Sequence, residues 1–342
     1  MKKILSIAVL FVVMLSSCDE EFEIAAPYKS VSLVYGLLDQ GDAAHYIRIQ
    51  KAFLDGNKNA LLMAQNPDSS ELKNITVTMK EFSGTNLISS TVLTKVDLIA
   101  EGFPKDSGAF FNAPHFAYKY THPLNSNYTY RLSILHDDNG KVDSAETPVI
   151  DQNFSVAQFN FASYQVDFSR TTNNATMDVN GIWPDAAKYL EAVLTLHYVD
   201  KALPSGVQTD KSLNIRIPAV VKTGPSFVAK LTKREIYMAL ANNLPKAEAD
   251  LERYMDSATL TVYMGGEELY NYNNVEAVQG SGITADQIQV KYTNIKGENV
   301  LGLLNTRAKR ERINIPVSNS TLDSLTTNAL TADLNFVGRS DH

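Results

Sequence analysis

The stretch YTYRLSI at residues 128–134 alternates apolar and polar side chains without a break. Successive side chains of an extended strand point to opposite faces, so one face would carry tyrosine, leucine and isoleucine and the other threonine, arginine and serine. The tripeptide DNG follows at residues 138–140, and Asn-Gly is a strong signal for a tight hairpin turn. The stretch therefore predicts a half-buried strand that turns back into a β-hairpin.

Other parts of the first half show the same pattern. Residues 46–50 and 75–80 also alternate, and Gly-containing turn sequences occur at residues 55–56 and 83–84. About seven short strands at such spacings, without a helical period, are typical of an antiparallel immunoglobulin-like β-sandwich. We expect this domain over residues 28–148, ending near Thr147-Pro148.

The second half is also rich in strand-like runs, and it predicts a second β-domain over residues 152–338. The expected strands lie at residues 156–168, 175–179, 190–198, 213–217, 227–231, 258–264, 288–292, 300–304, 313–317 and 330–337. The expected fold class is thus mainly β, with two antiparallel β-sandwich-like domains.

A short helical insertion is expected near residues 232–256. Thr232 and Glu235 have the spacing of a capping box, in which each side chain satisfies a free amide at a helix start. This predicts a helix to about Asn243. A second helix is expected over residues 246–255, because Pro245 suits a first helical turn and residues 251, 254 and 255 form an apolar stripe.

The N-terminus has the pattern of a bacterial lipoprotein signal peptide. Two lysines precede an apolar run from Ile4 to Leu15, and small residues then precede Cys18. Spanning a bilayer needs about 20 apolar residues, more than this run offers. We expect removal of residues 1–17, acylation of Cys18 with palmitate or a similar chain, and an acidic tether at residues 18–29. An ordinary secretory signal is the alternative.

Composition excludes some classes of function. The net charge is −7, whereas nucleic-acid binding needs massed lysine and arginine, so no nucleic-acid partner is expected. Cys18 is the only cysteine, which leaves the body of the protein without disulfides, a catalytic thiol or cysteine-bound metal. Apolar burial must therefore stabilise both domains.

The sequence lacks motifs for hydrolytic zinc, a serine nucleophile elbow or a phosphate loop. We therefore predict a non-enzymatic protein without a cofactor or metal. Two alternatives remain: a glycosidase-like hydrolase, whose two carboxylates leave no local motif, and a purely structural or adhesive envelope component.

Two groups of residues are candidates for ligand binding. Tyr263, Tyr270 and Tyr272 lie near Gly265-Gly266, and tyrosine offers both an apolar ring and a hydroxyl. Arg307 and Arg310 belong to the basic cluster at residues 307–312, which would suit an anionic headgroup, sugar or carboxylate. The alternatives are core packing for the tyrosines and a solvated loop or strand edge for the basic cluster.

Two segments could be interpreted as metal sites, but other interpretations explain them better. His115 and His122 flank an aromatic segment but lack a third ligand. Residues 137–143 are rich in aspartate, but they lack the ligand spacing of a calcium loop. A hairpin tip explains that segment better.

Several segments resemble an uncharacterised outer-membrane lipoprotein family of Bacteroidota: Cys18 with the acidic residues after it, and residues 34–39, 45–53, 292–295 and 301–303. The resemblance implies a lipid-anchored, cell-surface protein of the outer membrane, acting as a binding or accessory subunit near a TonB-dependent transporter. It implies no catalytic residues. Ser144, Ser257 and Ser324 match the O-glycosylation sequon of that phylum.

Overall fold

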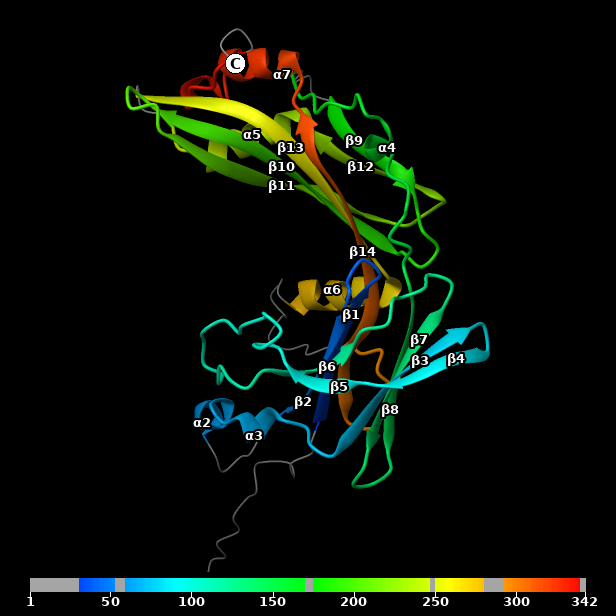
Figure 1. Ribbon diagram of the computed structural model, residues 1–342. Helices are drawn as coiled ribbons and strands as arrows, with labels where there is room; N and C mark the ends of the chain where they lie inside the picture. The colour runs from blue at the N-terminus through cyan, green and yellow to red at the C-terminus, as the bar shows by residue number, and fades with distance from the viewer. Residues whose placement is uncertain (1–30, 53–58, 170–174, 247–249, 280–291, 339–342) are drawn as a thin grey trace, which may run out of the picture.

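The computed structural model describes residues 31–52, 59–169, 175–246, 250–279 and 292–338, and β-strands dominate them. Two stacked halves are visible (Figure 1). The first half contains β1 (Val31–Asp39), β2 (His45–Ala52), α2 (Ala60–Ala64), α3 (Pro67–Ser70), β3 (Ile75–Ser83), β4 (Asn86–Val92), β5 (Thr94–Asp97), β6 (Phe116–Tyr120), β7 (Thr129–His136) and β8 (Val142–Pro148).

The remaining elements are α4 (Ala157–Asn160), β9 (Thr176–Ile182), β10 (Tyr189–Ala202), β11 (Gln208–Val221), β12 (Ser226–Thr232), α5 (Lys233–Asn243), β13 (Leu251–Gly265), α6 (Glu267–Gln279), β14 (Val300–Pro316), α7 (Asn319–Thr327) and a 3-10 turn at Ala332–Leu334. One eight-stranded sheet runs through both halves in the order β11-β10-β13-β14-β1-β2-β6-β5. A four-stranded sheet, β4-β3-β7-β8, and a two-stranded sheet, β12-β9, complete the fold.

Strand β14 joins the two halves (Figure 1). Its first part pairs in parallel with β1, from Val300 beside Ser32 to Arg307 beside Asp39. Its second part pairs antiparallel with β13. Val300 and Leu304 lie in the core of the first half, whereas Ala308 and Ile315 lie in the core of the second. The first half thus depends on residues more than 250 positions away in the sequence.

Gly302 makes the close β1–β14 pairing possible. Its φ is +133°, and a Cβ atom there would lie 1.8 Å from the carbonyl oxygen of Val34. Residues with a side chain rarely adopt such a backbone conformation. Position 302 therefore requires glycine for two reasons: its backbone conformation and the close approach of the Val34 carbonyl.

The first half is a sandwich of two facing sheets. Alternate residues of β1, β2, β3 and β7 point into one core, in which Val34, Ile47, Met79 and Leu132 are fully buried. The hairpins predicted at residues 83–84 and 138–140 are confirmed, and Gly84 and Gly140 have the positive φ that such turns require. The turn predicted at residues 55–56 lies outside the described residues.

The second half packs helices and the small sheet against β10, β13 and the end of β14. Helix α5 confirms the predicted capping box: the Thr232 hydroxyl accepts from the Glu235 amide, while the Glu235 carboxylate accepts from the Thr232 amide. Helix α7, which was not among the expected elements, begins after Ser318, whose hydroxyl accepts from the Thr321 amide.

The second predicted helix, over residues 246–255, is wrong, because residues 251–255 begin strand β13. Arg253 and Met255 share the buried face of this strand. A charged residue at a core position hides the period of two, and the remaining apolar residues mimic a helical stripe.

Two predicted strands are also wrong. Residues 156–168 contain α4 and only isolated bridges at Val156 and Val166. Residues 330–337 contain the 3-10 turn and Asn335, whose φ is +54°. Both segments contribute apolar side chains to the second core, among them Phe168 and Phe336, without joining a sheet ladder. The strands predicted at residues 300–304 and 313–317 are one continuous strand, β14, and the strand predicted at 288–292 falls mostly outside the described residues.

Among the residues described, no helix has both the length and the apolar character to cross a bilayer.

Candidate ligand-binding groove

A groove of about 910 Å³ lies over β1 and β2 on the face opposite the sandwich core. The alternation of the strands creates this face: Val34 and Ile47 point into the core, so Tyr35, Tyr46 and Arg48 point away from it. The described residues that line the groove are Tyr35, Gly36, Leu37, Asp42, Ala43, Ala44, His45, Tyr46, Arg48, Leu98, Glu101, Phe103, Leu269, Tyr272, Asn273, Leu303 and Arg307.

Two walls flank the floor of the groove. Helix α6, which lies across β1 and β14 in Figure 1, supplies Leu269, Tyr272 and Asn273. The segment after β5 supplies the opposite wall, with Leu98, Glu101 and Phe103. The elements that form the groove thus come from three distant parts of the sequence.

Aromatic and aliphatic side chains dominate the lining. The Tyr35 and Tyr272 rings meet edge to face with centroids 6.5 Å apart, and those of Tyr46 and Phe103 do so at 5.3 Å. Tyr35 is 41% exposed, Leu37 39% and Phe103 52%. Large exposed apolar side chains that gather in a concavity are typical of a ligand-binding site.

The carboxylate of Glu101 in the groove is already occupied. It accepts a hydrogen bond from Lys119 Nζ at 2.5 Å and another from the Tyr46 hydroxyl at 2.8 Å. These two bonds hold the pKa of Glu101 below its usual value. At the other end of the groove, Arg307 Nε lies 3.3 Å from Asp39 Oδ2, so these two charges balance each other.

Arg48 differs from these charged residues. Its Nη2 donates to Gln50 Oε1 at 3.2 Å, but its Nε is buried and has no hydrogen-bond partner among the described residues. Two basic residues lie near it: burial, and then the charge of Arg48, lower the pKa values of Lys105 and His115. Unlike Arg307, Arg48 pairs with no carboxylate in the described part of the chain.

His45 also borders the groove, but it lies on the core-facing side of β2 with Ile47, and it is only 2% exposed. Neither ring nitrogen has a hydrogen-bond partner within the described ranges. Burial lowers the pKa of His45, while the negative charges of Asp42 and Asp39 act in the opposite direction. The folded protein therefore favours the neutral imidazole.

The structure places two of the predicted ligand-binding residues, Tyr272 and Arg307, in this groove. The three tyrosines do not share a loop: Tyr263 is on β13, whereas Tyr270 and Tyr272 are on α6. The Tyr270 ring packs against Tyr189 with a centroid distance of 5.8 Å, away from the lining of the groove.

The basic cluster at residues 307–312 is part of β14, not a loop. Arg310 donates to the carbonyl of Phe154 and lies over the Phe159 ring at 5.3 Å. Arg312 donates to the carbonyls of Gln158 at 2.6 Å and Phe161 at 2.7 Å. These two arginines hold the segment around α4 against β14.

The three sequon serines lie within regular elements. Ser144 is on β8, where its backbone pairs with Lys296, and Ser257 is on β13. The Ser324 hydroxyl on α7 donates to the Ser169 carbonyl and accepts from Tyr237. Cys18 lies outside the described residues.

The structure does not bring the other polar candidates together. His115 and His122 flank opposite ends of β6. At the β7–β8 hairpin, Asp143 bonds to His136, and Asp137 accepts from Thr76. Within the described ranges, no three histidine, cysteine, aspartate or glutamate side chains form a group that could hold a metal ion.

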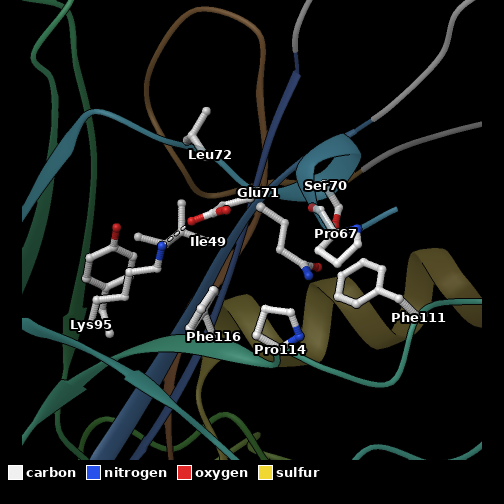
Figure 2. A pocket seen from close by; sticks show the side chains of 11 residues that line it. Ile49, Pro67, Ser70, Glu71, Leu72, Lys95, Phe111, Pro114 and Phe116 are labelled. Carbon is white, nitrogen blue, oxygen red and sulfur yellow. Dashed lines mark hydrogen bonds and ion pairs between the residues drawn. The ribbon is translucent and has the colours of Figure 1, made fainter. Parts of the chain in front are cut away.

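A second pocket, between α3, β2 and β6, is much smaller (Figure 2). Its volume is about 30 Å³, room for one or two water molecules. Glu71 and Lys95 form an ion pair at one side of it, and Lys95 Nζ lies 4.2 Å from the centre of the Phe116 ring. This pocket is too small for an organic ligand of ordinary size.

Sequence reasoning missed Tyr46, Arg48 and the wall at residues 98–103. Strand alternation at residues 46–50 does place Tyr46 and Arg48 on one face. No local signal shows that α6 and the segment after β5 rise on either side of that face.

Comparisons with known proteins do not assign the chain to a family. No protein-family model matches the chain, and no curated protein is similar to it in sequence. The C-terminal globular domain of an oligosaccharyltransferase from Pyrococcus abyssi is 10% identical, with a TM-score of 0.22, over 63% of this chain and 40% of that one. The chain thus matches less than half of that domain's length. CBD12 from CALX1.2 is 7% identical, with a TM-score of 0.16, over 81% of this chain and 98% of that one.

Proposed function

We propose that this chain is a lipid-anchored envelope protein that binds a ligand in the groove over β1 and β2 without transforming it. The observation that carries this proposal is the groove itself. It has the volume of a small-molecule site and exposes Tyr35, Leu37 and Phe103 to a possible occupant.

The lowered pKa of Glu101 supports a binding function over a hydrolytic one. A glycosidase needs a carboxylic acid whose pKa is raised, so that it can protonate the leaving group. Hydrogen bonds from Lys119 and Tyr46 lower the pKa of Glu101 instead. This carboxylate is suited to holding Tyr46 and Lys119 in place.

The lipid anchor is proposed from the sequence at residues 1–18. Labelling cells with palmitate and comparing the parent with Cys18→Ala tests it. The parent should carry label and sediment with outer membranes, and the variant should do neither. Native co-purification from the same membranes tests the proposed association with a transporter.

Native mass spectrometry of the purified protein tests the binding function. The parent should retain a small molecule from the cells, and Leu37→Glu, which places a charge on the floor of the groove, should lose it. Leu135→Glu is a matched control, since Leu135 is 37% exposed and lies on β7 in the other sheet. Equal ligand retention by both variants would refute a binding role for the groove.

A further inference from the structure

The guanidinium of Arg48 is poorly supplied with hydrogen-bond acceptors, because its buried Nε has no partner among the described residues. Buried polar groups in native proteins are almost always hydrogen-bonded, and an unsatisfied charged donor costs free energy. In the described part of the chain, Gln50 is the only hydrogen-bond partner of this guanidinium. Arg48 also lines the groove, so a ligand there can contact the part of its side chain that borders the groove.

The charge balance around Arg48 favours a negative group. Lys105 and His115 are its electrostatic neighbours. The carboxylates nearby are engaged elsewhere: Glu101 accepts from Lys119 and Tyr46, and Asp97 Oδ1 accepts from the backbone amides of Ile99 and His115. Asp42, the other acidic residue of the lining, acts on His45. An anion at Arg48 would supply a negative partner that this guanidinium lacks among the described residues.

The rest of the lining fits an apolar body. Tyr35, Leu37, Phe103 and Tyr272 surround the space beside Arg48 with rings and a methyl-bearing side chain. The volume, about 910 Å³, falls within the range of sites for small molecules, and it indicates an occupant smaller than a folded partner.

We propose that the groove binds a small amphipathic organic anion, whose charged group contacts Arg48 and whose ring or acyl body packs between Tyr35, Phe103 and Tyr272. This inference rests on the proposed binding function and names the class of ligand. Arginine suits the role, because its planar guanidinium offers paired donors to a carboxylate or a similar anion.

Two fluorescent probes of similar shape test the inference: the anion 8-anilino-1-naphthalenesulfonate and the neutral N-phenyl-1-naphthylamine. The parent should bind the anion more tightly than the neutral probe, with one site per chain. In Arg48→Gln the anion should bind about tenfold more weakly, as expected for loss of a charge-assisted contact. The neutral probe should keep its affinity.

Arg131→Gln is the matched control, since it removes the same charge from β7 in the other sheet, where Arg131 pairs with Glu146 at 2.6 Å. It should bind both probes like the parent. Leu37→Glu should bind neither.

The outcomes separate the inference from the function on which it rests. If Arg48→Gln binds both probes like the parent while Leu37→Glu binds neither, the groove binds ligands but the anion site is refuted. If Leu37→Glu binds the neutral probe like the parent, the binding groove itself is refuted.

Discussion

Each half of the molecule has an arginine on a central strand, and the two arginines differ in how fully their side chains are hydrogen-bonded. In the second half Arg253 is fully buried, and its Nε donates to Asp200 at 2.9 Å. Its Nη1 donates to the carbonyls of Pro245 at 2.8 Å and Leu334 at 3.0 Å. In the first half Arg48 has one amide partner and a buried, unpaired Nε in the described chain.

This difference in hydrogen bonding assigns a structural role to Arg253 and a binding role to Arg48. A buried arginine with all its partners in the same chain fixes the elements around it, in this case β13, β10 and the C-terminal segment. An arginine that faces a groove without a carboxylate partner lowers stability unless a ligand binds there. We therefore expect substitution of Arg253 to change folding, and substitution of Arg48 to change binding.

The largest expected effect is that of Arg253→Met. It leaves Asp200, whose side chain is 7% exposed, with Lys211 as its remaining partner in the described region. Breaking a buried ion pair in this way typically costs about 3–5 kcal/mol. Urea unfolding followed by the fluorescence of Trp183, which lies in the second core, measures it. A loss well below 1 kcal/mol would remove the contrast on which the comparison rests.

Gly302→Ala tests how the two halves are joined. The added methyl group meets the Val34 carbonyl, and the backbone keeps a φ that alanine avoids. We expect a loss of about 2–3 kcal/mol, from overpacking and backbone strain.

Amide hydrogen exchange of Gly302→Ala shows which strands lose stability. Protection should fall first in β1 and the start of β14, and less in β10 and β13. Uniform loss of protection would show that the halves unfold as one unit.

Thr232→Ala should cost about 1 kcal/mol, because it removes half of the capping box that starts α5. The effect should be confined to the second half. Thermal unfolding monitored by Trp183 fluorescence measures it, and Thr94→Ala, an exposed threonine on β5, is the control. Equal effects of both substitutions would contradict the role of the cap.

Acid should weaken the first half through His45. The folded protein lowers the pKa of His45 from its ordinary 6.5. Just below that pH the unfolded chain therefore binds more protons than the folded one. The contribution to stability is complete above about pH 6.5 and falls as the pH drops towards the folded pKa.

His45→Leu should reduce this loss. Urea unfolding followed by tyrosine near-ultraviolet circular dichroism, at about pH 7.5 and about pH 5.5, measures the change. An equal loss in the variant and the parent would exclude His45 as the cause.

The sequence predicts much of the fold because its strands alternate with little interruption. The hairpins around Gly84 and Gly140 and the cap at Thr232 carry strong local signals, and the structure confirms them. The errors arise where tertiary contacts override the local pattern. Arg253 occupies a core position because distant carbonyls and Asp200 satisfy it, and no neighbouring residue indicates this.

The groove is less predictable for a similar reason. Tyr272 and Arg307 are found from local sequence, as a tyrosine near Gly265-Gly266 and as part of the basic cluster at residues 307–312. Arg48 is not found, because its importance depends on the absence of a carboxylate partner, which is a property of the folded surroundings. The parallel pairing of β1 with β14 brings Tyr35 and Arg307 to one face, and it joins residues far apart in the sequence.

The smallest expected loss of stability is that of Arg48→Gln, which should be at least as stable to urea unfolding as the parent in the absence of ligand, because it removes a charged donor that the described residues leave without a partner. The most direct test of the account repeats this unfolding with saturating 8-anilino-1-naphthalenesulfonate. A ligand that binds only the folded state stabilises it by about 2.7 kcal/mol at a hundred times its Kd. The account predicts stabilisation of the parent and much less of the variant at the same probe concentration. Equal stabilisation of both, or a large loss of stability in the unliganded variant, would contradict it.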